Sequence, residues 1–342
     1  MNLLTSNARP AATTAGKLLL IVAALKLVAS LVSLIPTNRG IVRMLDFVRE
    51  PSIYLSIVLI VLAILLARRW RWVIVGLLGL AIAINLYRLW PYPSLAASEI
   101  PLPDRVAGMS CARVLSLNVL QTNDQYDRTA ALIRREAPDI VLLMETNRRW
   151  IEALEPVLST YGYRLDMPLD NKYGMAFATN LDVDRAQMIA NTNANTPTLY
   201  ATMRMEDGAR FEMIGLHPRP PLPGESTESR DENIAKAGAR TSGDSDNVVA
   251  VGDFNDVPWS RTTQNFVAMG DYLDPRVGRG TFATFPSDWR FIGWPLDQLF
   301  VKNGVKVESF RVLDDVGSDH RPIVADLCVQ PGTETRELDP PQ

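Results

Sequence analysis

Polar residues able to bind a metal ion or a phosphate follow short apolar runs in the second part of the chain. They are Asn118 in RVLSLNVL, Glu145 after DIVLLM, His217 after RFEMIGL, and Asp253 and Asn255 after NVVAVG. Places where strands pass into loops often carry catalytic side chains. Each position alone has an ordinary explanation, such as a turn made by an Asn or Asp side chain or a Glu that caps a helix. Five such positions in one chain favour a functional site.

The segment VGSDHRP adds Asp319 and His320, one of only two histidines in 342 residues. An aspartate partner raises the basicity of an imidazole and fixes its tautomer. Displacement at phosphorus spreads negative charge over oxygen atoms, which a metal ion and a cationic imidazole stabilise while a carboxylate handles the attacking water. The residue types therefore suit metal-dependent hydrolysis of a phosphate ester. Both histidines of the chain fall in this set, which favours functional over structural roles for them.

The elements that position these residues alternate between strands and helices. The apolar runs read as strands, YGMAFATN is a further one, and residues 125–137, 147–161 and 229–241 carry helical spacing. Residues 111–330, about 220 in number, are enough for one sizeable core. This order predicts a soluble α/β domain. Residues 331–342 have too few apolar side chains to fold and are predicted to form a disordered tail.

Six motifs of this domain carry a resemblance to a known family. The blocks LSLNVL, LLMETN, GLHPRPP, VGDFND, PLDQLFV and GSDHRPIVADL resemble, in order and spacing, those of the endonuclease/exonuclease/phosphatase superfamily. That group includes DNase I, abasic-site endonucleases, neutral sphingomyelinases and inositol polyphosphate 5-phosphatases. The resemblance covers about Cys111 to Val329 and implies the DNase I-like four-layer α/β sandwich.

The resemblance also implies a role for each matching residue. Asn118, Glu145 and Asp319 are expected to hold a divalent cation, and such oxygen ligands suit Mg²⁺ or Mn²⁺. The residues expected near the phosphate are Asp253 and Asn255 for the attacking water, His320 for the phosphate itself, Asp297 of PLDQLFV hydrogen-bonded behind His320, and His217 as the second histidine.

Three long apolar stretches precede this domain, at residues 18–35, 52–67 and 72–90. Each is near the roughly 17 to 25 residues that cross a bilayer, and Trp and Tyr lie at the ends of the spans. Buried helices of a soluble core or a cleaved signal peptide fit three successive stretches poorly. We therefore predict a three-span anchor over residues 1–91, a Pro-rich linker over 92–110, the catalytic domain over 111–330 and the tail.

The charges of the short loops predict an orientation in a plasma membrane of bacterial type. Arg9, Lys17 and the cluster at residues 68–71 outweigh the arginines of the loop between the first two spans. The N-terminus is then cytoplasmic and the catalytic domain extracytoplasmic. Lys26 falls inside the first span, where a charge must snorkel, pair or face water, or else meet a phosphate.

The charge balance bears on the substrate. Residues 111–330 hold 23 Lys and Arg against 31 Asp and Glu, the wrong balance for a protein that grips a nucleic-acid backbone. The anchor favours a lipid phosphate, and three spans before such a domain resemble the VanJ-like membrane branch, linked to polyprenyl pyrophosphate (undecaprenyl type) turnover. A membrane-tethered nuclease or phosphodiesterase and an inactive binding or sensing module remain alternatives.

Two further segments invite a hypothesis about a lipid substrate. The Pro-rich residues 218–232 are a candidate lid beside His217. The aromatic residues of SDWRFIGWP, which are Trp289, Phe291 and Trp294, are candidates for contact with the membrane interface, although aromatic residues near a strand are more often part of a core.

The only cysteines, Cys111 and Cys328, lie on the first and last strands of the expected domain. If these strands are antiparallel neighbours and Asn118 pairs with Arg321, Cys111 faces Cys328, at a separation within reach of a disulfide. An oxidising exterior would permit the bond. Two buried residues with free thiols are the alternative.

Overall fold

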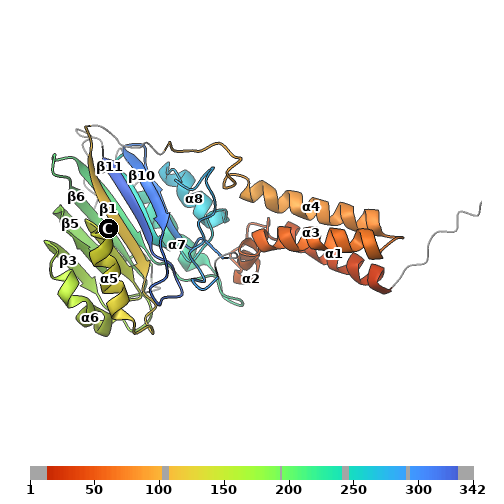
Figure 1. Ribbon diagram of the computed structural model, residues 1–342, viewed down its shortest axis with the longest axis horizontal. Helices are drawn as coiled ribbons and strands as arrows, with labels where there is room; N and C mark the ends of the chain where they lie inside the picture. Colours follow the sequence, from red (N-terminus) through yellow and green to blue (C-terminus); the bar gives the residue numbers. More distant parts are fainter. Residues whose placement is uncertain (1–13, 102–107, 193–194, 241–245, 290–292, 330–342) are drawn as a thin grey trace, which may run out of the picture. The chain divides into compact units, whose positions relative to one another are not determined.

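The computed structural model describes residues 14–101, 108–192, 195–240, 246–289 and 293–329 (Figure 1). The chain forms two compact units, Met1–Trp90 and Pro91–Gln342. The predicted tail and Phe291 lie outside the described residues.

The first unit consists of three long apolar helices, as the sequence predicts. They are α1 (Thr14–Val32), α3 (Arg49–Leu66) and α4 (Arg71–Leu89), with the short α2 (Gly40–Arg43) and η1 (Met44–Asp46) between the first two. Their 18 or 19 residues correspond to about 27 to 29 Å, close to the hydrocarbon thickness of a bilayer. All three are long and apolar enough to cross a membrane.

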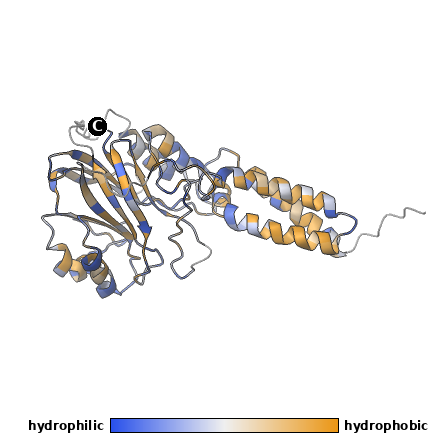
Figure 2. Ribbon diagram, turned by 45° about the horizontal axis from the view of Figure 1, so that its top comes forward, coloured by the Kyte–Doolittle hydropathy of each residue, from blue (hydrophilic) through white to orange (hydrophobic). Residues whose placement is uncertain are grey.

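Small residues are prominent among the buried residues of this bundle, and many of its large apolar residues are exposed. Figure 2 shows that its helices are mostly hydrophobic. The buried cluster contains Ala23, Ala63, Ala67, Ile74 and Leu78. Alanine at helix contacts lets the backbones approach closely, which is how helices associate in lipid. The outward leucine, isoleucine and valine side chains suit contact with acyl chains.

The second unit contains two β-sheets. The first has the order β10-β11-β1-β2-β4-β3, and the second has the order β5-β6-β7-β8-β9. Strands of the first sheet are β1 (Ser110–Asn118), β2 (Ile140–Met144), β3 (Tyr163–Met167), β4 (Met175–Thr179), β10 (Val305–Val312) and β11 (Ile323–Val329). Strands of the second are β5 (Asp182–Ala190), β6 (Pro197–Arg204), β7 (Arg210–Leu216), β8 (Val248–Asp253) and β9 (Asp297–Val301).

Helices cover the outer faces of both sheets, so the unit has four layers, α/β/β/α (Figure 1). On the first sheet lie α5 (Tyr126–Glu136) and α6 (Arg148–Leu158), and on the second lie α7 (Glu228–Arg240) and α8 (Arg261–Gly270). The largest apolar cluster fills the space between the sheets. The predicted four-layer α/β sandwich is confirmed, and the predicted helices correspond to α5, α6 and α7.

Both sheets mix parallel and antiparallel pairs in a way that gathers strand ends. β1 is parallel to β2, and β7 is parallel to β8, so their carboxyl ends meet at a common edge in each sheet. β9 is antiparallel to β8 and places Asp297 opposite Asp253. One end of the sandwich therefore receives the ends of β1, β2, β7 and β8 and the start of β9. We call it the site end, and the other the far end.

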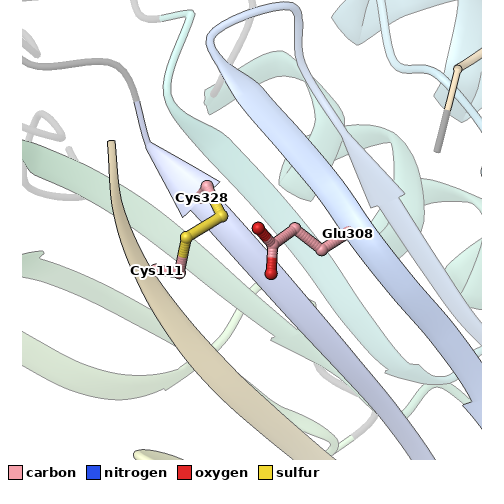
Figure 3. Close-up of side chains that lie close together, drawn as sticks. All are labelled: Cys111, Glu308 and Cys328. Atoms are coloured by element: carbon pink, nitrogen blue, oxygen red, sulfur yellow. A yellow bond between two sulfur atoms is a disulfide. The ribbon is translucent and has the colours of Figure 1, made fainter. Parts of the chain in front are cut away.

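The cysteines are joined at the far end. β1 and β11 are antiparallel neighbours with Cys111 opposite Cys328, which is the predicted register, and the two sulfur atoms form a disulfide. The free-thiol alternative is therefore wrong in this structure. Glu308 lies beside the disulfide (Figure 3). Because both sulfur atoms are bonded to each other, neither is a thiolate ligand for a metal ion.

Residues 92–100, the first part of the predicted linker, belong to the second unit and pack within it. The ring of Tyr92 is 2% exposed and meets Trp259 edge-on with 5.7 Å between centroids. The carboxylate of Glu99 accepts a hydrogen bond from the backbone of Asp274, and Ile100 joins the core between the sheets. The composition of this segment is typical of a linker, but Tyr92 and Ile100 are buried.

Candidate active site

Side chains from both sheets meet at the site end. Asn118, the last residue of β1, is buried, and its Nδ2 atom donates hydrogen bonds to Glu145 Oε1 (3.1 Å) and to Asp253 Oδ2 (3.0 Å). Its Oδ1 atom accepts from the backbone of Leu120. One amide thus links the carboxylates that follow β2 and end β8.

Two glycines allow the backbone to approach closely around these carboxylates. A Cβ atom on Gly174, at the start of β4, would lie 1.8 Å from the carbonyl oxygen of Thr146, the residue after Glu145. A Cβ atom on Gly252 would lie 2.1 Å from the carbonyl oxygen of Leu216, the residue before His217, and Gly252 has φ +142°. Only glycine fits at either position.

Non-glycine residues in the left-handed region follow three of the site strands. They are Leu120, Glu145 and Asn255, with φ between 48° and 62°. For an ordinary L-residue this conformation costs about 1 kcal/mol. The surrounding hydrogen bonds hold Glu145 in place, since its Oε2 atom accepts from the backbone of Gln121 at 3.0 Å. Such local strain is characteristic of functional sites.

His320 and Asp297 form a buried pair. His320 Nδ1 is 2.8 Å from Asp297 Oδ2, and both side chains are at most 6% exposed. Burial opposes protonation of the ring, but Asp297, Asp253 and Asp319 together outweigh it and raise the pKa of His320 to about 10. These carboxylates therefore favour the protonated ring, which donates from Nδ1 to Asp297. This fixes its orientation and leaves the Nε2–H for another acceptor.

Asp253 lies between the two histidines. Its Oδ2 atom is 3.6 Å from Nε2 of His217 and 3.7 Å from Nε2 of His320, and its Oδ1 atom accepts from the backbone N–H of Asn255 at 2.8 Å. The structure therefore brings together two imidazoles that lie 103 residues apart in sequence around one carboxylate. Asp253, Asp297 and His320 are also close enough to one another to form a possible metal-ligand group.

Asp319 supplies the last carboxylate of the predicted set and is half-buried. Burial raises the pKa of Asp319, and the nearby carboxylates of Glu145 and Asp253 raise it further against the opposing effect of His320. Several carboxylates thus repel one another at this point. Mg²⁺ or Mn²⁺, which prefer such oxygen ligands, reduce this repulsion when bound. The residues fit the divalent cation that the sequence predicts.

The side chain of Asn255 does not join the cluster through its amide group. Its Nδ2 atom donates to the carbonyl oxygen of Pro218, 3.0 Å away. Asn255 therefore ties the segment after His217 to the loop after β8. Hydrogen bonds and short distances bring together Asn118, Glu145, His217, Asp253, Asp297 and His320 at the site end. Asp319 is near enough to His320, Glu145 and Asp253 to interact with their charges.

Two residues of the site were not identified from the sequence. The ring of Tyr173 lies 5.2 Å from that of His217, with the guanidinium of Arg219 5.5 Å from its centroid. Ser318 donates from Oγ to the carbonyl of Asn118 at 2.6 Å and accepts from the backbone of His320 at 3.1 Å. In the sequence, Ser318 directly precedes Asp319 and His320, and Tyr173 directly precedes Gly174. These positions hint at a role in the site, but the contacts of both residues are known only from the fold.

The aromatic residues of the segment SDWRFIGWP differ in their environment. Trp289 is 60% exposed, whereas Trp294 packs against Phe285, whose ring lies 5.0 Å from that of His320. The backbone of Ser287 donates to the carbonyl of Asp319 at 2.8 Å. Trp294 thus belongs to the support of the site, and Trp289 presents an apolar surface next to it.

Comparison with known proteins agrees with this geometry. The family model "Endonuclease/Exonuclease/phosphatase family" matches residues 115–320. No curated protein sequence matches the chain.

Solved structures with the same fold cover about two thirds of the chain. An endonuclease/exonuclease/phosphatase family protein from Bacteroides thetaiotaomicron has 18% identity and a TM-score of 0.54, over 65% of this chain and 99% of that one. D. rerio TDP2 complexed with single strand DNA product has 14% identity and a TM-score of 0.54, over 64% and 99%. The mannosyl-6-phosphatase of Bacteroides thetaiotaomicron has 18% identity and a TM-score of 0.51, over 63% and 98%.

At these identities the solved structures establish the fold alone, while the family model spans more than half of the chain. Hydrolases of this family act on phosphoester bonds and typically depend on Mg²⁺. With its sandwich and its matched motifs, the chain belongs to the endonuclease/exonuclease/phosphatase family.

Proposed function

We propose that this protein is a membrane-anchored phosphohydrolase that uses Mg²⁺ or Mn²⁺ to cleave a lipid phosphate ester or pyrophosphate at the membrane surface. The single observation that carries the proposal is the presence, in one chain, of a complete phosphohydrolase cluster and a three-helix apolar anchor. A polyprenyl pyrophosphate, as in the VanJ-like branch, is the substrate we favour. We place the catalytic unit outside the cell, and the disulfide suits that side.

The charged residues divide the work of the reaction. The imidazolium of His320 faces the nonbridging oxygens of the phosphate, and Asp297 keeps the ring protonated and oriented. Asp253, held by Asn118 and the backbone of Asn255, orients the attacking water and accepts its proton. His217 lies on the other side of Asp253 and supplies a second contact to the phosphate.

Asn118, Glu145 and Asp319 would hold the cation. When bound, Mg²⁺ or Mn²⁺ neutralises charge on the phosphate oxygens. The fixed amide of Asn118 and the constrained backbone of Glu145 prepare their oxygen atoms before any ligand arrives, so little reorganisation is needed on binding.

The three apolar helices support a substrate in the membrane, because all three are long and apolar enough to cross a bilayer. The acidic balance of residues 111–330 also disfavours a nucleic-acid backbone as the partner.

Release of phosphate from polyprenyl pyrophosphate in mixed micelles tests the proposal with the full-length protein. We expect activity with Mg²⁺ or Mn²⁺ and loss of activity with a chelator. Glu145→Ala, Asp253→Ala and His320→Ala should each lower kcat/KM by a factor of about 10² or more. Near-normal turnover in two of these folded variants would overturn the mechanism. Efficient nicking of plasmid DNA with no cleavage of lipid would replace the substrate by nucleic acid, and no hydrolysis of any phosphate ester would leave a binding module.

A further inference from the structure

A second charged cluster lies in the anchor, at the end from which the chain continues into the catalytic unit. We call Lys26, Arg43, Asp46, Arg49, Asn85 and Arg88 the anchor cluster. The arginine at its centre, Arg49, opens α3 and is 1% exposed. A fully buried guanidinium in a membrane bundle is costly unless it is paired.

The hydrogen bonds of Arg49 tie the three long helices together. Its Nε and Nη2 atoms donate to Asp46 Oδ1 at 2.9 and 2.7 Å, and its Nη1 atom donates to Asn85 Oδ1 of α4 at 3.2 Å. Asn85 donates in turn to Ser30 Oγ of α1 at 2.9 Å. Arg49, Asp46 and Asn85 therefore have a structural role, which is to hold the three long helices together.

The other cations of the cluster take no part in those hydrogen bonds of Arg49 and Asn85. Arg43 pairs with the same carboxylate, Asp46, at 3.1 Å. Arg88 lies one turn after Asn85 on α4, its Nε atom has no hydrogen-bond partner among the described residues, and it is near enough to Arg49 to repel it. Lys26 donates to the neutral Ser52 Oγ at 2.7 Å.

Positive charge is therefore in excess at this end of the anchor. Between residues 14 and 90 the only acidic residues are Asp46 and Glu50, and Glu50 accepts a hydrogen bond from Tyr54 at 3.0 Å. These two carboxylates are outnumbered by the four cations of the anchor cluster, Lys26, Arg43, Arg49 and Arg88, and Asp46 forms ion pairs with Arg43 and Arg49. Phosphate is the anion that guanidinium groups recognise best, and basic sites between membrane helices bind lipid head groups.

We propose that the anchor cluster binds the phosphate head group of an anionic lipid, with Arg88 and Arg43 as the principal contacts. The proposal concerns the anchor alone and stands whether or not the catalytic unit acts on lipid. The phosphate can belong to a bulk phospholipid or to a polyprenyl phosphate. Both offer the same chemistry, and the experiment separates them.

Native mass spectrometry of the full-length protein, released from micelles with one added lipid at a time, tests the site. Phosphatidylglycerol and polyprenyl phosphate should remain bound at an occupancy about tenfold above that of phosphatidylcholine. Arg88→Gln should remove most of this difference. Arg69→Gln, which deletes one charge at the opposite end of the anchor, is the matched control and should retain it.

The outcomes decide both the site and the source of the phosphate. Equal retention of both anionic lipids indicates bulk phospholipid, and strong preference for polyprenyl phosphate indicates the isoprenoid source. Retention of zwitterionic lipid to the same extent, or equal losses in Arg88→Gln and Arg69→Gln, would overturn the proposal. If Arg88→Gln misfolds by circular dichroism, Arg43→Gln carries the same test, with the same control.

Discussion

The two ends of the sandwich arrange their charged residues differently. At the site end, Glu145, Asp253, Asp297 and Asp319 crowd around two histidines, and burial and mutual repulsion raise the pKa of Asp319. At the far end, Asp326 accepts from Arg113 at 2.7 Å, and a disulfide joins the strands beside that pair. Aspartates paired with basic side chains can thus serve chemistry at one end of a fold and stability at the other.

Two aspartates that each pair with one basic side chain test whether the site end serves activity and the far end serves stability. Asp297→Asn should lower kcat/KM by a factor of about 10² or more, because His320 loses the charge that keeps it protonated. Asp326→Asn should leave activity unchanged and cost roughly 1 kcal/mol of stability, since its pair with Arg113 is partly exposed. Steady-state kinetics and thermal melting measure both. Equal activity losses in the two variants would remove the distinction between the ends.

Removal of the disulfide should produce the largest change in stability. The bond closes a loop with a sequence separation of 217 residues, and its loss in Cys111→Ser/Cys328→Ser should cost about 2–4 kcal/mol. Activity at 25 °C should remain, because Cys111 lies at the far end of β1 from Asn118. Thermal melting of the full-length protein, with and without a reducing agent, gives the measurement. The reducing agent should lower the Tm of the wild type and leave that of the variant unchanged.

Metal binding at the site end should stabilise the folded state. Mg²⁺ at about 100 times its Kd would add about 2.7 kcal/mol to the free energy of unfolding. Asp319→Asn should reduce this gain, while its metal-free form should be at least as stable as the metal-free wild type, because the variant lacks one repelling charge. Melting curves with Mg²⁺ and with chelator compare the two. A full Mg²⁺ response in the variant would exclude Asp319 as a ligand.

A dependence of stability on pH is expected from Glu212 at the far end. Burial raises the pKa of Glu212 from 4.5 to about 7, against the attraction of Lys302. The folded state then retains a proton that the unfolded state loses between pH 4.5 and 7, so stability falls as pH rises through this window. Glu212→Gln should show no such fall and should exceed the wild type by up to about 3 kcal/mol at pH 8. Denaturant titrations at pH 5 and pH 8 test this, and parallel pH profiles would contradict it.

Much of the site end was predictable because its residues follow regular strands. Asn118, Glu145 and Asp253 end β1, follow β2 and end β8, and the parallel pairs bring them together. The assumed pairing of Asn118 with Arg321 also predicted the register of β1 and β11, in which Cys111 lies opposite Cys328. Local sequence patterns and matched motifs carry this information, since strand periodicity and chain order determine it.

Other features depend on tertiary contacts that no local pattern encodes. Tyr173 meets His217 only because Gly174 lets β4 approach the loop after Glu145. The strands β3, β5, β6 and β10 and the helix α8 were not identified. The half-exposed side chains of β5 and the polar start of α8 resemble loops. The packing of residues 91–100 was also missed, since Pro-rich composition outweighed two apolar side chains.

The packing of residues 91–100 determines where a soluble fragment must begin. A fragment cut at Cys111, where the matched motifs suggest a boundary, would lack Tyr92 and Ile100. It would uncover Trp259 and the part of the core that Ile100 fills. Such newly exposed apolar surface promotes aggregation. A fragment that starts at Pro91 retains these contacts, so we expect it to be purified without detergent and crystallised more readily than one that starts at Cys111.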